Sequence, residues 1–226
     1  MTDRIRFALL ILVVLACVTA RAEGALGAVD HADRIEHVDH ISRATLVAQR
    51  QEKIVRFARH FLGGMLDHFG ALMCIGNPTV NSYCRMWDTR FWAPIYKNWG
   101  WQNRTTTVRV ATGGRFEYRG VDSSCNPYLT VATLLRAGLD GIRRKLDPGE
   151  PQQGNTYDLL AEGAEIEKVP ESLGAALNAL AKDEIIKSAM PGRLYKVFHH
   201  YKRDEWERYL AAVTDWEFDE YLEVLP

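Results

Sequence analysis

The spacing of apolar residues predicts a long amphipathic helix in the first half of the chain. Between Ile41 and about Leu72, apolar side chains recur every three or four residues, which is the period of a helix with one buried face. The double glycine at positions 63–64 would weaken an isolated helix, so we expect it to pack closely against another element. The helix should end near Gly76, because Pro78 follows it.

The period changes to two further along the chain. The segment Thr105–Val110 is rich in β-branched residues, and charged and aromatic residues alternate strictly over Arg115–Arg119. Both patterns favour strands. Thr112-Gly113-Gly114 lies between the two strands and is a hairpin signal. If the loop has three residues, with a glycine in the left-handed conformation, Arg109 lies opposite Glu117.

This hairpin places charged and aromatic side chains on opposite faces. Because side chains alternate along a strand, Arg115, Glu117 and Arg119 share one face, and Phe116 and Tyr118 share the other. The charged face suits bidentate capture of phosphate or carboxylate oxygens. It equally suits a ladder of cross-strand ion pairs, which is common and weakly stabilising. Spacing alone favours the ladder.

The remainder of the chain reads as helical. We expect a helix over Pro127–Arg144, capped by Asp122, Ser123 or Ser124. The composition of Asp147–Asn155 predicts a loop. A short helix, capped by Ser172, should run to Ala181.

A longer helix is expected over Gly192–Val213. Its expected buried face consists of Leu194, Val197, Phe198, Tyr201, Trp206, Tyr209 and Leu210. We expect three aromatic residues to dock the tail that follows: Trp216, Phe218 and Tyr221. The pair His199-His200, beside Lys202 and Arg203, is interpreted as part of a solvated helix face rather than an anion site.

Length and charge narrow the class of protein. The chain has 226 residues, which suits one domain of ordinary size or a domain with an appendage. Its apolar and charged fractions are typical of a globular protein. The formal net charge of −1 argues against a nucleic-acid binder, because neutralising phosphates calls for a clear basic excess.

Residues 1–22 have the layout of a secretory signal peptide. A basic flank precedes a short apolar run, and Ala20-Arg21-Ala22 forms a small-x-small cleavage pattern. Residues 23–50 form a polar connector that continues into the first helix. Its three histidines, His31, His37 and His40, could form a metal cluster with nearby acids, but a solvated linker is the preferred interpretation because no ligand spacing is diagnostic.

Other histidines and cysteines give weaker signals. His60 and His68 lie on the first predicted helix and, without a partner motif, are interpreted as packing or surface residues. Removing the leader leaves Cys74, Cys84 and Cys125, an odd set without framework spacing. That set leans towards a reducing compartment.

Several uncommon motifs occur together in the central region. They are Asn77-Pro78-Thr79-Val80-Asn81-Ser82-Tyr83 followed by Arg85, then Ala93-Pro94, Asn103-Arg104, Arg109, Arg115-x-Glu117-x-Arg119 and Asn126-Pro127-Tyr128. In order and spacing they resemble the C-terminal half of the glutamine synthetase catalytic domain. The resemblance covers residues 51–226. It implies an α+β fold in which antiparallel strands pack with helices.

The resemblance also implies roles for the charged residues. Arg85 would contact the γ-carboxylate of glutamate and the phosphoryl group, and Arg119 would hold substrate and stabilise charge during transfer. Glu117 would bind Mg²⁺ or Mn²⁺. The arginines implied to line the ATP phosphates are Arg104, Arg109 and Arg115.

In this family, ATP phosphorylates the γ-carboxylate of glutamate, and ammonia or an amine then displaces phosphate. The resemblance therefore implies a homo-oligomeric ligase, and we expect a cytoplasmic location because ATP and glutamate are cytosolic. Two positions depart from the family: Cys84 replaces a lysine, and Trp92 replaces a flap glutamate. An aromatic, wider amine site would suit an alkylamine acceptor, as in γ-glutamylmethylamide synthetases. The tryptophans that could line it, or could instead be core and subunit contacts, are Trp87, Trp92, Trp99 and Trp101.

The sequence lacks counterparts of the family's N-terminal domain and of its other acidic metal ligands. Because one carboxylate is too few for a two-metal site, we expect the chain to be a truncated catalytic half without synthetase activity of its own. Two alternatives stay open. One is a non-catalytic protein that binds nucleotides or anions, and the other is an exported protein that uses the sheet structurally.

Overall fold

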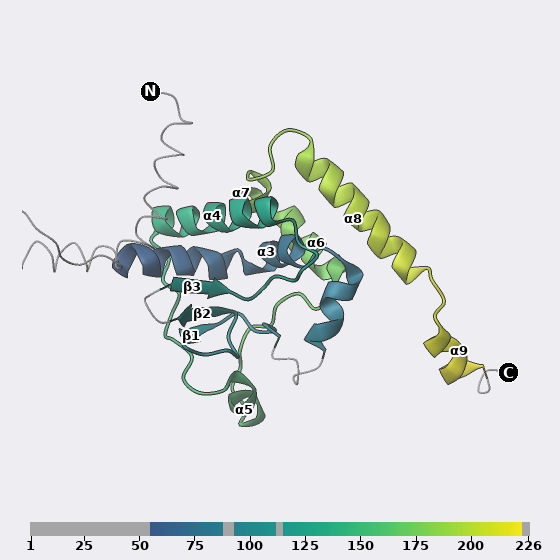
Figure 1. The fold of residues 1–226 in the computed structure, drawn as a ribbon, viewed down its shortest axis with the longest axis horizontal. Coiled ribbons are helices and arrows are strands. Elements are labelled where there is room, and N and C mark those ends of the chain that lie inside the picture. The colour runs from purple at the N-terminus through teal and green to yellow at the C-terminus, as the bar shows by residue number, and fades with distance from the viewer. Residues whose placement is uncertain (1–54, 88–92, 112–114, 223–226) are drawn as a thin grey trace, which may run out of the picture. The chain divides into compact units, whose positions relative to one another are not determined.

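The computed structural model describes residues 55–87, 93–111 and 115–222 (Figure 1). The leader over 1–22, the connector over 23–50 with its histidines, and the beginning of the first helix lie outside the described residues. None of the described helices has both the length and the apolar composition needed to cross a membrane.

The first described element is a helix over residues 55–67, which a turn at His68 separates from α3 (Phe69–Gly76). The helix end predicted near Gly76 is therefore confirmed. The Asn77 amide bonds to the Met73 carbonyl at 2.8 Å and closes the last turn. The interruption at His68 was not predicted, because the apolar period continues across it.

A three-stranded sheet follows, in the order β1 (Trp99–Trp101), β2 (Val108–Ala111) and β3 (Arg115–Tyr118). Strands β2 and β3 are antiparallel and place Arg109 opposite Glu117, so the predicted register is confirmed. Strand β1 is an addition to the prediction and runs parallel to β2.

The first predicted strand begins three residues too early. Thr105–Thr107 are buried in a turn before β2, not in a strand. Their polar groups bond to side chains on either side of β1: the Thr105 hydroxyl donates to the Asn103 side chain at 2.7 Å, and the Thr107 amide donates to the Asn98 side chain at 3.2 Å. These local bonds replace the ladder that a strand would provide.

The aromatic face of β3 packs on the helices. Phe116 stacks on Phe61 with ring centroids 6.4 Å apart, and Tyr118 meets the edge of Phe69 at 5.8 Å. In Figure 1 the sheet lies beside the helical layer formed by α3 and α4. The charged side chains of β3 therefore face away from this layer, as the alternation predicts.

Helix α4 (Pro127–Arg144) has the predicted bounds but a different cap. The Asn126 side chain accepts hydrogen bonds from the amides of Tyr128 and Leu129. Asp122 instead accepts a bond from the Ser124 amide in the preceding turn. The reason is position: Pro127 is the first helical residue, so only the residue immediately before it can cap the helix.

The core is centred on α3 and α6 (Leu173–Lys182), whose predicted cap Ser172 accepts a bond from the Ala175 amide at 3.2 Å. The remaining elements are η1 (Val80–Met86), α5 (Thr156–Ala161), α7 (Glu184–Lys187), α8 (Leu194–Leu210) and α9 (Asp215–Tyr221). The fully buried side chains of this core include Phe69, Leu72, Met73, Ile75, Leu173, Leu177, Leu180 and Ile186.

The predicted buried face of α8 is largely wrong. The side chains that pack partly against the core are Tyr195, Phe198 and Trp206. Most of the expected face is exposed, namely Leu194, Val197, Tyr201, Tyr209 and Leu210. Tyr195 starts a second apolar row, which lies about 100° round the helix from the row that starts at Leu194. The sequence alone does not decide which of the two rows packs against the core. The three aromatics expected to dock the tail, Trp216, Phe218 and Tyr221, are also exposed.

Candidate functional site

Arg85 lies at the end of η1. It is held by one residue that precedes the sheet in the chain and by one that follows it. Its Nη2 donates to the Asn77 side-chain oxygen at 2.7 Å and to the Val121 carbonyl at 3.0 Å. Asn77 is fully buried and donates in turn to the Gly120 carbonyl at 2.9 Å. The buried amide thus joins the end of α3, Arg85 and the segment after β3.

The charges around Arg85 connect it to the strand face. Burial lowers the pKa of Arg85, the charge of Arg119 lowers it further, and Asp122 opposes both. Burial alone would raise the pKa of Asp122, but hydrogen bonds from Ser124 and Ser82 and the charge of Arg85 hold it below its ordinary value. Arg85 and Arg119 therefore belong to one electrostatic neighbourhood, and Asp122 is a carboxylate beside Arg85 in it.

The strand face forms around Glu117. Arg109 Nη1 lies 2.8 Å from one carboxylate oxygen of Glu117, and Arg119 Nη1 lies 3.4 Å from the other. The Glu117 side chain is 39% exposed, whereas those of Arg109 and Arg119 are 17% and 20% exposed. The ladder of ion pairs is thus present, and it leaves two half-buried guanidinium groups around one accessible carboxylate.

Two of the arginines at the site have a donor atom without a partner among the described residues. Arg109 Nη2 donates to the side chain of Gln102 at 2.8 Å. The Nε atoms of Arg85 and Arg109 are buried and have no hydrogen-bond partner within the part of the chain that the structure describes. Buried polar atoms normally have partners, so an acceptor from a ligand would complete this arrangement.

The other two predicted arginines are less fixed. Arg104 lies in the turn after β1, and Arg115 begins β3; both are exposed. The side chain of neither arginine makes an ion pair or a hydrogen bond within the described segments. The structure therefore gathers Arg85, Arg109 and Arg119 with Glu117, and leaves the side chains of Arg104 and Arg115 exposed to solvent.

The surroundings of Glu117 limit how it could bind a metal ion. Each of its oxygens already accepts a hydrogen bond from an arginine. Because a carboxylate has about four lone-pair positions, further contacts with a cation are possible. In residues 55–87, 93–111 and 115–222, no group of three or more potential ligands gathers at one point. Glu117 would therefore hold Mg²⁺ only together with ligands from outside the described residues, such as the substrate phosphates and water that Mg²⁺ usually keeps.

The sequence does not predict two of the residues that bond to the arginines of the site, Asn77 and Gln102. Asn77 was recognised only as part of a motif, and its buried position is what explains its role. Gln102 has no sequence signal; it adopts a left-handed backbone conformation with φ of 50° and points its amide at Arg109.

The tryptophans divide between core and surface. Trp99 is buried, with its ring centroid 5.9 Å from that of Trp101. Trp87 and Trp101 are largely exposed, and Trp92 lies outside the described residues. Trp99 is therefore a core residue, as one of the two interpretations of these tryptophans expects.

Comparison with known proteins identifies relatives over most of the chain. The family described as "Glutamine synthetase, catalytic domain" matches residues 41–221. A glutamine synthetase from Pyrococcus woesei is 42% identical over 190 residues, which cover 76% of this chain and 43% of the relative. A glutamate–methylamine ligase from Methyloversatilis universalis is 42% identical over 176 residues, covering 74% of this chain and 39% of the relative.

Solved structures give the same result for the fold. A structure described as a GmaS/ADP complex aligns with a TM-score of 0.68 at 37% identity, and covers 74% of this chain and 40% of the matched one. A ligand-free GmaS structure aligns with a TM-score of 0.67 at 38% identity. The expected α+β fold, a partial catalytic domain of this type, is therefore confirmed. The chain spans about two fifths of the length of the relatives it matches.

Proposed function

The chain belongs to the glutamine synthetase family, and on that premise we propose that it provides the phosphate- and glutamate-binding part of an ATP-dependent ligase. The reaction joins ammonia or a small amine to the γ-carboxylate of glutamate. The observation that carries the proposal is the set of half-buried arginines around Glu117, which lies on the strand predicted to carry it. The relative structure described as an ADP complex supports a nucleotide as ligand.

The proposed mechanism rests on charge placement. Transfer of a phosphoryl group asks a protein mainly for positioning and charge neutralisation. In the proposal, Arg85 and Arg119 bind the γ-carboxylate and the transferred phosphoryl group, while Arg109 holds the ATP phosphates. Arg104 and Arg115 would reach the phosphates from the exposed side of the hairpin. A bound Mg²⁺ or Mn²⁺ would neutralise phosphate charge, and Glu117 would hold it.

The ion pairs of Glu117 favour a second candidate function. Both of its oxygens are engaged by arginines, and the described residues gather no further acidic ligands around it. Such a face can bind a nucleotide or another anion without turning it over. The second candidate is therefore a nucleotide- or anion-binding protein without ligase activity.

Calorimetric titration of the purified full chain with ATP and MgCl₂ tests the part common to both functions. We expect saturable binding that the Arg109→Met variant weakens by about tenfold or more, which corresponds to the loss of one charge-assisted contact. Formation of γ-glutamyl hydroxamate from glutamate, ATP and hydroxylamine would assign the ligase. Binding without this product would show that the chain alone binds nucleotide without turning it over, as both the expected truncated half and the second function require. Absence of ATP binding would refute the ligase and the nucleotide-binding form of the second function.

Replacing Glu117 by glutamine should separate metal binding from nucleotide binding. The neutral amide is a poorer cation ligand, so we expect the affinity for Mn²⁺ in the presence of ATP to fall by about tenfold or more. Electron paramagnetic resonance of free Mn²⁺ measures this directly. The control is Glu167→Gln, which removes a more exposed carboxylate paired with Lys97 at 3.0 Å. Equal Mn²⁺ affinity in the two variants would contradict the proposed role.

The amine acceptor, assembly and location remain part of the proposal. Both glutamine synthetases and a glutamate–methylamine ligase are similar to this chain, so ammonia and methylamine are the acceptors to compare in the same assay. The family resemblance predicts a homo-oligomer. The use of ATP and glutamate predicts a cytoplasmic protein.

A further inference from the structure

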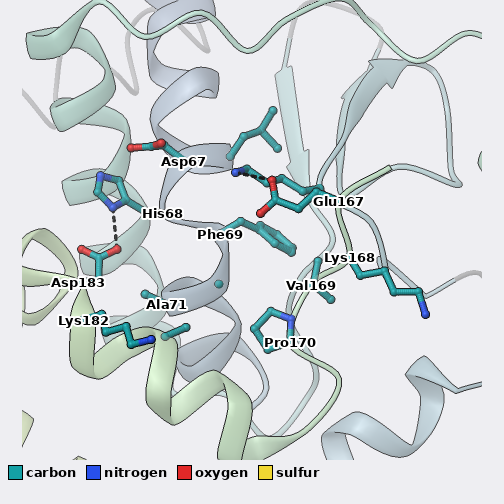
Figure 2. Close-up of a pocket in the computed structure, with 14 residues that line it drawn as sticks. Asp67, His68, Phe69, Ala71, Glu167, Lys168, Val169, Pro170, Lys182 and Asp183 are labelled. Atoms are coloured by element: carbon teal, nitrogen blue, oxygen red, sulfur yellow. Dashed lines mark hydrogen bonds and ion pairs between the residues drawn. The ribbon is translucent and has the colours of Figure 1, made fainter. Parts of the chain in front are cut away.

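His68 occupies the turn that separates the helix over 55–67 from α3. Its side chain is 7% exposed, although histidine is only moderately apolar and no apolar stripe requires it there. The residue also forms part of the wall of a pocket of about 540 Å³ beside α3 and α6 (Figure 2). It lies outside the arginine site and is unused by the proposed mechanism.

Both ring nitrogens of His68 meet carboxylates. Nδ1 lies 2.7 Å from an Asp183 oxygen, and Nε2 lies 3.1 Å from an Asp140 oxygen; Figure 2 shows the contact with Asp183. Neutral imidazole has one N–H, whereas imidazolium has two. Because ionised carboxylates only accept hydrogen bonds, the protonated ring alone satisfies both contacts.

Further charges surround this group. From α4, Arg144 Nη1 lies 3.0 Å from the Asp140 carboxylate and 2.7 Å from that of Asp67, which belongs to the helix over 55–67. From α6, Lys182 stands on the same pocket wall (Figure 2). On the opposite wall are Glu167, its ion-pair partner Lys97, and Lys168. Acidic groups therefore contact the ring directly, and the cations lie further out.

Burial is the largest influence on His68 and lowers its pKa. Hydrogen bonds to Asp183 and Asp140, together with the charges of Asp183 and Asp67, outweigh burial and raise the pKa above the ordinary value of 6.5. A group whose pKa is raised by folding stabilises the folded state. This stabilisation is fully present at pH values below the pKa of the unfolded state, and it is lost as the pH rises through the pKa of the folded state. The contacts of His68 should therefore weaken on the alkaline side of pH 6.5.

The position of these contacts connects them to the arginine site. Helix α3 begins directly after His68, and its eight residues, at 1.5 Å each, carry the chain about 12 Å to Gly76. Asn77 follows and holds Arg85. Asp140 belongs to α4, which starts just after the segment that supplies the Val121 carbonyl to Arg85. His68 thus joins the start of α3, which leads to Asn77, to α4, which follows the segment that contains Val121.

We propose that His68 is a positioning residue: its imidazolium bridges Asp140 and Asp183, fixes the start of α3, and so makes the seating of Arg85 at the other end sensitive to pH. The proposal concerns the geometry of the arginine site and does not depend on which ligand that site binds.

The test is amide hydrogen exchange of the full chain without ligand. Two amides report on the far end of α3: Asn77, which bonds to the Met73 carbonyl, and Asp122, which bonds to the Gly76 carbonyl at 2.9 Å. After correction for intrinsic exchange, we expect their protection to fall between pH 6 and pH 8.5. Each unit by which folding raises the pKa of His68 corresponds to a tenfold change in the protection factor. The amide of Val108, which starts β2 and bonds to the carbonyl of Asn98 just before β1, should change much less.

Two variants locate the response. In His68→Gln, protection at Asn77 should be low at both pH values. In Asp183→Asn, the response should move to lower pH, because one acidic partner is gone while asparagine still caps α7 at the Ile186 amide. The control is His60→Gln, which removes a ring bonded to the Leu146 carbonyl rather than to a carboxylate, and it should keep the wild-type response.

An unchanged pH response in His68→Gln would overturn the proposal, as would a wild-type chain whose Asn77 protection is flat across this range. If His68→Gln does not fold, the shift in Asp183→Asn and direct titration of the His68 ring by nuclear magnetic resonance decide the matter. None of these measurements uses ATP or turnover, so failure of this proposal and failure of the proposed function are distinguishable.

Discussion

Replacing Gly64 by alanine is expected to lower the free energy of unfolding by about 3 kcal/mol, the upper end of what an added methyl group costs in a packed interior. A Cβ at this position would lie 2.8 Å from the backbone of Gly141 and closer still to the Ala137 carbonyl. All of these atoms are backbone atoms of α4, so no side chain can rotate away. The two helices would have to separate.

Thermal and urea unfolding measure this loss. For a folded unit of this size, about 3 kcal/mol corresponds to a fall in Tm of roughly 10 °C. The matched control is Gly70→Ala, in α3, where the new Cβ would meet the Ala179 Cβ at 3.3 Å and Pro170 at 3.8 Å. There the helix propensity gained, up to about 1 kcal/mol, offsets a mild contact. Similar losses in both variants would show that the helix crossing is not the cause.

The same crossing shows which parts of the fold were accessible from the sequence. The double glycine predicted a close approach to another element, and Gly64 indeed lies against Gly141. The register of Arg109 and Glu117 was accessible because an alternating strand and a three-residue loop leave only one pairing. The start of α4 was accessible because proline at a first helical position is a local signal.

What the sequence missed depends on distant partners. Strand β1 has three residues, too few to show a period, and its parallel pairing with β2 is non-local. His68 was interpreted as a packing or surface residue because Asp140 and Asp183 lie 72 and 115 residues away. On α8, two apolar rows compete, and only the position of the core decides between them.

The candidate site divides in the same way. The family resemblance named the arginines and Glu117, but it did not show how they are held. Asn77 is buried completely and bonds to Arg85 and to the Gly120 carbonyl. That arrangement follows from the packing of α3 against the end of β3, which no local pattern encodes.

Replacing Asn77 by leucine is accordingly expected to cost about 3 kcal/mol of unfolding free energy. The leucine fills a similar volume, but it removes the donor to the Gly120 carbonyl and one of the two acceptors of Arg85 Nη2, which keeps only the Val121 carbonyl. A hydrogen bond to a charged group contributes about 1.5–3 kcal/mol, and an orphaned buried carbonyl adds to the loss. The exposed counterpart is the pair of Asn178 and Arg203, also joined at 2.7 Å. There the same change, Asn178→Leu, should stay within about 0.5 kcal/mol.

A double-mutant cycle with Arg85→Met then tests whether Asn77 acts through Arg85. Removing both partners orphans fewer groups than removing one, so the double variant should lose about 1–2 kcal/mol less than the sum of the two single losses. Urea unfolding of the four proteins gives this coupling energy. Phosphate or ATP titration of the same proteins should show weakened binding in Asn77→Leu and in Arg85→Met, with no further loss in the double variant. Additive losses in both measurements would mean that Asn77 supports the fold without positioning Arg85.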